Sequence, residues 1–168
     1  MDSSKGLDYT PEVRDVESVR TDTKKASSEI FDIIDLKGAV TKTGVALSSC
    51  GELDSEHYFK ISHPWSVYDV PVGDMKKAME RLKRELPKNG WKIARYAPDS
   101  SPSRSLELVA DSTKKKFSVS VTLYDAAKAS ESTAEPRTPS AKKISGIMVR
   151  VVSACYKVPK GKTTNDEF

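Results

Sequence analysis

The clearest pattern in the chain is an amphipathic stripe between residues 74 and 86. Its apolar members recur at helical spacing: Met75, Ala78, Met79, Leu82 and Leu86. This spacing places all of them on one face of an α-helix. Pro87 and then Asn89-Gly90 end the pattern, as they commonly do after a helix. The sequence therefore predicts a helix over residues 74–86.

Segments in which apolar and polar residues alternate follow this helix. They are residues 91–96, 106–110 and 117–123, and a final segment at 144–155. Such alternation suits a sheet that buries one face and exposes the other to water. We therefore expect four strands in the second half of the chain.

The first half carries weaker patterns. Apolar residues at helical spacing predict a helix over 11–36, with Thr10 as its cap and Pro11 in its first position. Residues 40–49 predict a short strand. Residues 58–68 predict another strand.

Pro64 lies within the second of these strands. Because proline has no amide hydrogen to donate to a neighbouring strand, we expect the strand at 58–68 to lie at a sheet edge or to be broken at Pro64.

Together these elements predict an α+β fold, with a mostly antiparallel sheet of four to five strands and two helices packed on one face. Residues 1–10 are expected to form a flexible tether, and residues 11–158 a single domain. The segment 125–143 has no Val, Leu, Ile or aromatic residue, so we expect a mobile loop. Residues 159–168 are expected to form a disordered tail.

Composition narrows the classes of function. Of the 168 residues 37% are hydrophobic and 31% charged, and the formal net charge is only +4. A nucleic-acid-binding domain usually concentrates more positive charge, so we expect no nucleic-acid partner. No stretch approaches the roughly 20 apolar residues that span a bilayer.

Few residues point to catalysis or to a metal. His57 and His63 are the only histidines, and neither cysteine has a partner at metal-binding spacing. No phosphate-binding glycine motif and no nucleophile elbow occurs. A Cys50–histidine pair would be the basis of a thiol enzyme. We predict no metal, no cofactor and no enzymatic activity.

The two cysteines, Cys50 and Cys155, leave two interpretations open. They form one disulfide, or they are ordinary buried thiols of a cytoplasmic protein.

Several motifs resemble predicted lipoproteins of Streptomyces and related actinobacteria. They are the segments 63–71, 86–93, 96–101, 106–112 and 152–156, and the similarity covers about residues 30–158. The resemblance brings no known activity and hence no catalytic residue.

The resemblance has two implications. The precursor would carry a signal peptide that ends in a lipidated cysteine, so that Met1 stands in place of that cysteine and residues 2–5 begin the tether. The protein would then be lipid-anchored at the extracytoplasmic face of the cell membrane. In that setting the resemblance favours a bridge between Cys50 and Cys155.

We therefore expect a non-enzymatic protein that binds another envelope protein or component. Trp65 and Tyr68 in the segment 63–71, and Asp99 and Arg104 in the loop 97–104, are the predicted contact residues. The alternative functions are an immunity or inhibitor lipoprotein that neutralises a toxin, a small hydrolase or thiol enzyme, and a cytoplasmic nucleic-acid-binding protein.

Overall fold

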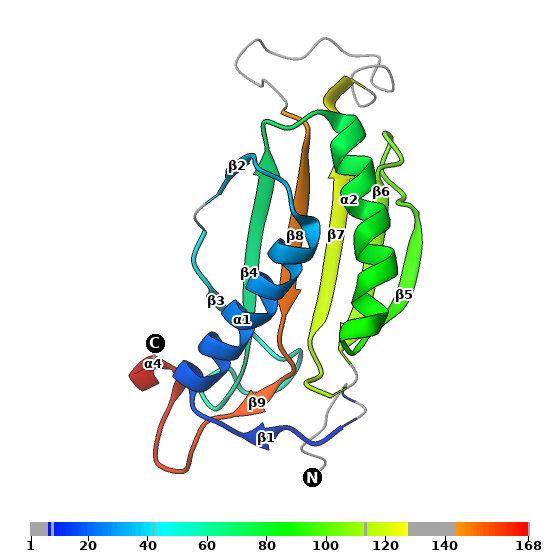
Figure 1. The fold of residues 1–168 in the computed structure, drawn as a ribbon. Coiled ribbons are helices and arrows are strands. Elements are labelled where there is room, and N and C mark those ends of the chain that lie inside the picture. Colours follow the sequence, from blue (N-terminus) through cyan, green and yellow to red (C-terminus); the bar gives the residue numbers. More distant parts are fainter. Residues whose placement is uncertain (1–6, 8, 42, 113, 128–143, 168) are drawn as a thin grey trace.

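Two helices lie side by side on one face of a mixed, nine-stranded sheet in the computed structural model of this chain (Figure 1). The structure describes residues 7, 9–41, 43–112, 114–127 and 144–167. The predicted α+β class and the placement of two helices on one face are confirmed.

The nine strands are β1 Glu12–Val13, β2 Ala39–Val40, β3 Ala46–Ser48, β4 Tyr58–Tyr68, β5 Trp91–Pro98, β6 Leu106–Ser112, β7 Ser118–Tyr124, β8 Gly146–Val152 and β9 Tyr156–Lys157. They follow the order β1-β9-β4-β8-β7-β6-β5, and β2 and β3 also pair with β4. Within the described part of the chain, only β1 and β9 pair in parallel. The prediction of four to five strands was therefore too low, because four strands have only two or three residues and carry no periodicity of their own.

The first helix, α1, spans Val16–Ile34 and begins later than predicted. Its cap is Asp15, whose carboxylate accepts a hydrogen bond from the Ser18 amide. The predicted cap Thr10 lies outside the helix because the following residues form β1, which pairs with β9. Both Thr and Asp are good cap residues, so the strand pairing decides between them.

The second helix, α2, spans Val72–Glu85 and continues as a single 3-10 turn, η1, over Leu86–Asn89. Gly90 ends it with a left-handed backbone at φ 86°. Every residue of the predicted stripe is fully buried against the sheet: Met75, Ala78, Met79, Leu82 and Leu86. The predicted second helix is confirmed.

The strand β4 is unbroken and lies inside the sheet, so the expectation drawn from Pro64 was wrong. Ser66 directs both its amide and its carbonyl toward Thr41, on the side of β2. Pro64 lies two residues earlier and has the same orientation. Its missing N–H therefore faces the stretch of chain between β2 and β3, where no strand requires it.

Odd-numbered residues of β4 and β8 face the helices, as do alternate residues of β6 and β7. This main core contains, among others, Ile30, Ile34, Trp65, Val67, Met79, Leu82, Leu108, Val119, Val121, Ile147 and Val149. The predicted alternation is confirmed in all three strands β6, β7 and β8. The strand predicted at 144–155 is shorter in the structure, where β8 ends at Val152. Residues 153–155 separate it from β9, which begins just after the predicted range.

The predicted terminal and loop segments lie partly outside the described residues. This holds for most of the 1–10 tether and for residues 128–143 of the predicted loop. The predicted tail from residue 159 differs from the structure, in which Thr164–Glu167 form a short helix, α4. The Thr164 hydroxyl donates to the Ser55 carbonyl and holds this end against the chain.

Candidate functional site

The four predicted contact residues do not form one surface. Trp65 is only 7% exposed and its ring packs edge-on against Phe31 of α1, with 5.9 Å between ring centroids. Tyr68 lies at the end of β4 on the opposite face of the sheet. Asp99 and Arg104 belong to the β5–β6 loop, and two strands separate β4 from β6. Trp65 is therefore a core residue in this fold.

Asp99 organises the β5–β6 loop from within. Its carboxylate accepts hydrogen bonds from the hydroxyl and amide of Ser101 and from the amide of Ser105. Chiefly through the Ser101 hydroxyl, these bonds hold the pKa of Asp99 below its ordinary value. Arg104, in a left-handed backbone conformation at φ 48°, is exposed beside it. Asp99 thus shapes the loop that presents Arg104.

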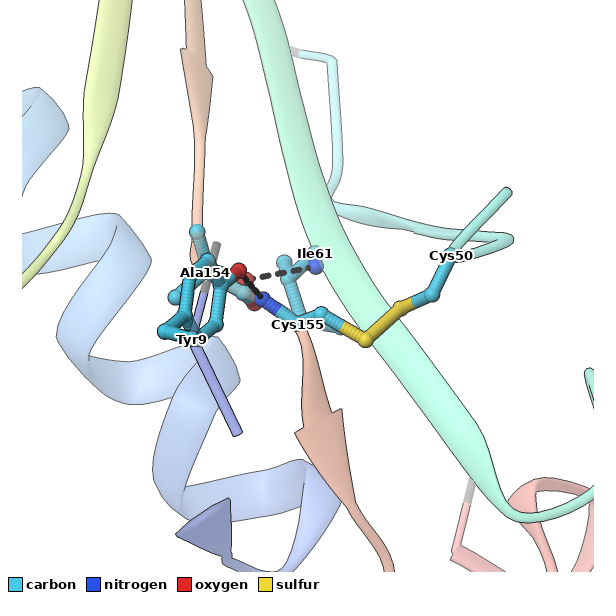
Figure 2. Close-up of a disulfide and its surroundings, with 6 residues drawn as sticks. Tyr9, Cys50, Ile61, Ala154 and Cys155 are labelled. Carbon is cyan, nitrogen blue, oxygen red and sulfur yellow. Dashed lines mark hydrogen bonds between the residues drawn. A yellow bond between two sulfur atoms is a disulfide. The ribbon is translucent and has the colours of Figure 1, made fainter. Parts of the chain in front are cut away.

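Cys50 and Cys155 form a disulfide, which confirms the pairing that the resemblance favoured (Figure 2). The bridge joins the loop after β3 to the turn between β8 and β9. The Cys155 amide donates to the Tyr9 hydroxyl at 2.8 Å, so the N-terminal segment lies against the same turn. A stable disulfide indicates an oxidising, extracytoplasmic environment.

The bridge also changes the chemistry open to the cysteines. With both sulfurs bonded to each other, neither is the thiolate that a cysteine enzyme requires. The Cys50–histidine pair that a thiol enzyme would require is therefore not made.

A serine and a histidine do meet in the structure, at Ser27 and His63. The Ser27 hydroxyl lies 2.7 Å from His63 Nδ1, and His63 Nε2 lies 2.8 Å from the Thr43 carbonyl. Because a carbonyl oxygen only accepts, the imidazole donates from Nε2. Ser27 is only 4% exposed, so no substrate reaches its hydroxyl in this conformation. The pair ties α1 to β4, and His63 Nε2 ties both to the segment between β2 and β3.

Asp54, Glu56 and His57 are the one group of three metal-binding side chains that the described residues bring together. Asp54 accepts from the Glu56 amide and pairs with His57 across one turn. These bonds, the His57 contact first, hold the pKa of Asp54 below its ordinary value. Because the bonds account for the geometry of an exposed turn, the group carries no argument for a metal.

The uncovered face of the sheet holds the most distinctive surface. Thr122, Met148 and Ser66 form one cross-strand row, and Ser120, Arg150 and Pro64 form the next. These side chains line a shallow depression of about 390 Å³. Met148 lies within it and is 48% exposed. We define these six residues as the Met148 depression.

Sequence reasoning missed this surface because it concentrated on the buried parity of each strand. The signal was nevertheless present in the alternation, since Met148 is a large apolar residue at a position that the pattern assigns to solvent.

Comparisons with protein-family models, with curated proteins and with solved structures gave no match for this chain. Among the described residues, no helix is both long and apolar enough to cross a membrane. Inferences about function therefore depend on the chain's own geometry.

Proposed function

We propose that this protein is a non-enzymatic binding protein of the cell envelope, and that it binds another envelope protein through the Met148 depression. The disulfide supports a place outside the cytoplasm. The resemblance to actinobacterial lipoproteins supports an N-terminal lipid anchor at the outer face of the cell membrane.

The exposure of Met148 is the observation that carries the binding proposal. A sheet with one wet face normally places polar side chains on that face, and Ser66 and Thr122, directly opposite Met148 on the two neighbouring strands, indeed carry hydroxyls. Met148 is the large apolar side chain among these residues, and it is 48% exposed. Methionine and arginine are enriched in protein interfaces, and methionine adapts its shape to a partner.

The surrounding side chains fit the same role. Ser66, Ser120 and Thr122 are small enough to let a partner approach the backbone of the sheet. Arg150 supplies a charged donor at the margin, held in place because its Nε donates to the Ser62 hydroxyl at 3.1 Å. An apolar centre with a polar rim is the usual anatomy of an interface between proteins.

Site-specific photocrosslinking in the native host tests this proposal. A photoreactive benzoylphenylalanine would replace Met148, and the matched control would carry it at Lys77, which is exposed on the far side of the molecule on α2. We expect a discrete protein adduct at position 148 and none at position 77.

A second variant distinguishes a specific interface from accidental contact. Thr122→Arg places a long, charged side chain in the row next to Met148, and it should abolish the adduct at 148 while thermal unfolding stays unchanged. The proposal is wrong if position 148 gives no adduct, if position 77 gives the same adduct, or if Thr122→Arg has no effect.

A further inference from the structure

A second concave region lies where β8 ends at Val152 and the chain turns away toward Cys155. A groove of about 940 Å³ opens there beside the Cys50–Cys155 bridge. Leu7 and Tyr9 of the N-terminal segment line it as well. The hydrogen bond from the Cys155 amide to the Tyr9 hydroxyl fixes that segment at the groove (Figure 2).

The side chains that line this groove carry more positive than negative charge. Among the described residues that line it, Lys60, Lys116 and Arg150 are cationic, whereas Glu52 alone is acidic. Within the described part of the chain none of the three cations forms an ion pair. Lys116 instead lies over the Tyr9 ring, 4.5 Å from its centroid.

Strand register explains how distant residues reach one groove. Ser62, Val152 and Ser118 form a cross-strand row. Lys60 comes two residues before Ser62, and Lys116 two residues before Ser118. Since neighbouring strands lie about 4.8 Å apart, the two outer strands of the row are roughly 10 Å apart. Two lysine side chains therefore flank the point where β8 leaves the sheet. Arg150 lies two residues before Val152 on β8, in the adjacent cross-strand row.

Solvated surface lysines alone would not define a site. Here three cations from separate segments line one groove, together with the hydroxyl of Ser118 and apolar surface from Leu7, Val152 and the disulfide. Arginine binds phosphate oxygens with a planar pair of donors, while lysine acts as a point charge.

We propose that this groove binds a phosphate-bearing ligand. Lys60, Lys116 and Arg150 contact the phosphate oxygens, and the apolar surface contacts the remainder of the ligand. The phosphate belongs either to the headgroup of an anionic phospholipid or to a free small phosphate ester. Only the lipid source rests on the envelope location proposed above; the site itself does not.

Titration of the isotope-labelled, disulfide-bonded protein tests the site. Glycerol 3-phosphate is the soluble probe, followed by amide NMR shifts, and vesicles of phosphatidylglycerol mixed with phosphatidylcholine are the membrane probe, followed by co-sedimentation. We expect at least one of the two probes to bind, with glycerol 3-phosphate shifting the amides of Ser118 and Val152 if the source is a free ester. Binding to vesicles alone identifies a lipid headgroup as the source.

Charge-matched variants make the test specific. Lys60→Gln with Lys116→Gln should weaken binding about tenfold. Lys24→Gln with Lys25→Gln removes the same charge from exposed positions on α1 and should leave binding within about twofold. Thermal unfolding confirms that both proteins fold.

The proposal is overturned if neither probe binds, or if the groove variant and the control lose binding equally. Lys60 and Lys116 do not line the Met148 depression. Failure here is therefore distinguishable from failure of the protein-binding proposal.

Discussion

The buried apolar side chains form two clusters, the main core and a smaller one that we call the lower cluster. The two are stabilised in different ways. The main core lies between both helices and the long strands, and its side chains are mostly fully buried aliphatic residues. The lower cluster contains only Val16, Val19, Phe59, Ile61, Ala154, Tyr156 and Val158 as buried residues. It lies where α1 meets the two-residue strands β1 and β9, and the Cys50–Cys155 bridge joins the chain beside it.

This contrast teaches where a chain of this size needs a covalent link. The main core buries enough apolar surface to order its elements without one. The two-residue strands and seven buried side chains of the lower cluster bury much less apolar surface. In the lower cluster, the disulfide, the bond from Cys155 to Tyr9 and the packing of Arg14 over the Tyr156 ring supplement the apolar contacts.

The largest effect should come from removing the bridge. Replacing both Cys50 and Cys155 with alanine frees a loop whose ends are 105 residues apart in the sequence. The chain-entropy account predicts a loss of about 4 kcal/mol in the free energy of unfolding, measured by urea denaturation. Hydrogen exchange should then show faster opening of β9 than of β6 and β7.

The control is the wild-type protein reduced under native conditions, which should reproduce the variant. Uniform acceleration of exchange through both regions, or a loss well below 1 kcal/mol, would show that the bridge is not a local support for the lower cluster.

A truncation within the main core should have a slightly smaller effect. Leu82→Ala removes a fully buried side chain of α2 from between the helix and the sheet. We expect a loss of about 3 kcal/mol, because the packed surroundings can collapse only partly around the cavity. Hydrogen exchange should accelerate more in β6 and β7 than in β9 in this variant. This is the reverse of the pattern expected when the disulfide is removed. Lys77→Ala, at an exposed position of the same helix, is the matched control.

The contrast between strong and weak patterns also explains what the sequence could predict. Helix α2 and strands β6 and β7 were predictable because each has enough residues to repeat its period several times. Strands β2 and β3 merge in the sequence into one segment, 40–49, since two or three residues define no period. Pro64 could not be placed correctly without knowing that β2 and β3 leave a stretch of β4 unpaired on that side.

The candidate sites were less accessible still. Met148 was visible as an apolar residue at an outward position. By contrast, Lys60, Lys116 and Arg150 lie far apart in the sequence and come together only through the register of β4, β7 and β8. Their spacing along the chain carries no local signal.

The smallest effect should come from the β5–β6 loop, outside both clusters. Asp99→Ala removes the acceptor for Ser101 and Ser105, and we expect a loss of about 1 kcal/mol at neutral pH. Because the folded-state pKa of Asp99 is lowered, its contribution is complete above the ordinary aspartate pKa of about 3.9. It is lost as the pH falls through the lower folded-state pKa.

Denaturation of the wild type, of Asp99→Ala and of Asp99→Asn between about pH 2 and pH 7 measures this dependence. Asp99→Asn keeps an acceptor for Ser101 and Ser105 but cannot ionise. It should therefore remove the pH dependence that Asp99 contributes and retain part of its contribution to the free energy of unfolding. A difference between wild type and Asp99→Ala that stays constant across this pH range would contradict the assignment.

The central claim is that this protein works outside the cytoplasm with its two cysteines joined. The most direct test is a thiol titration under denaturing conditions, with intact mass, on protein isolated from its native host. We predict no free thiol and a mass lower than the reduced chain by one pair of hydrogen atoms. Two free thiols in the native protein would contradict the claim, and with it the envelope location on which the proposed function rests.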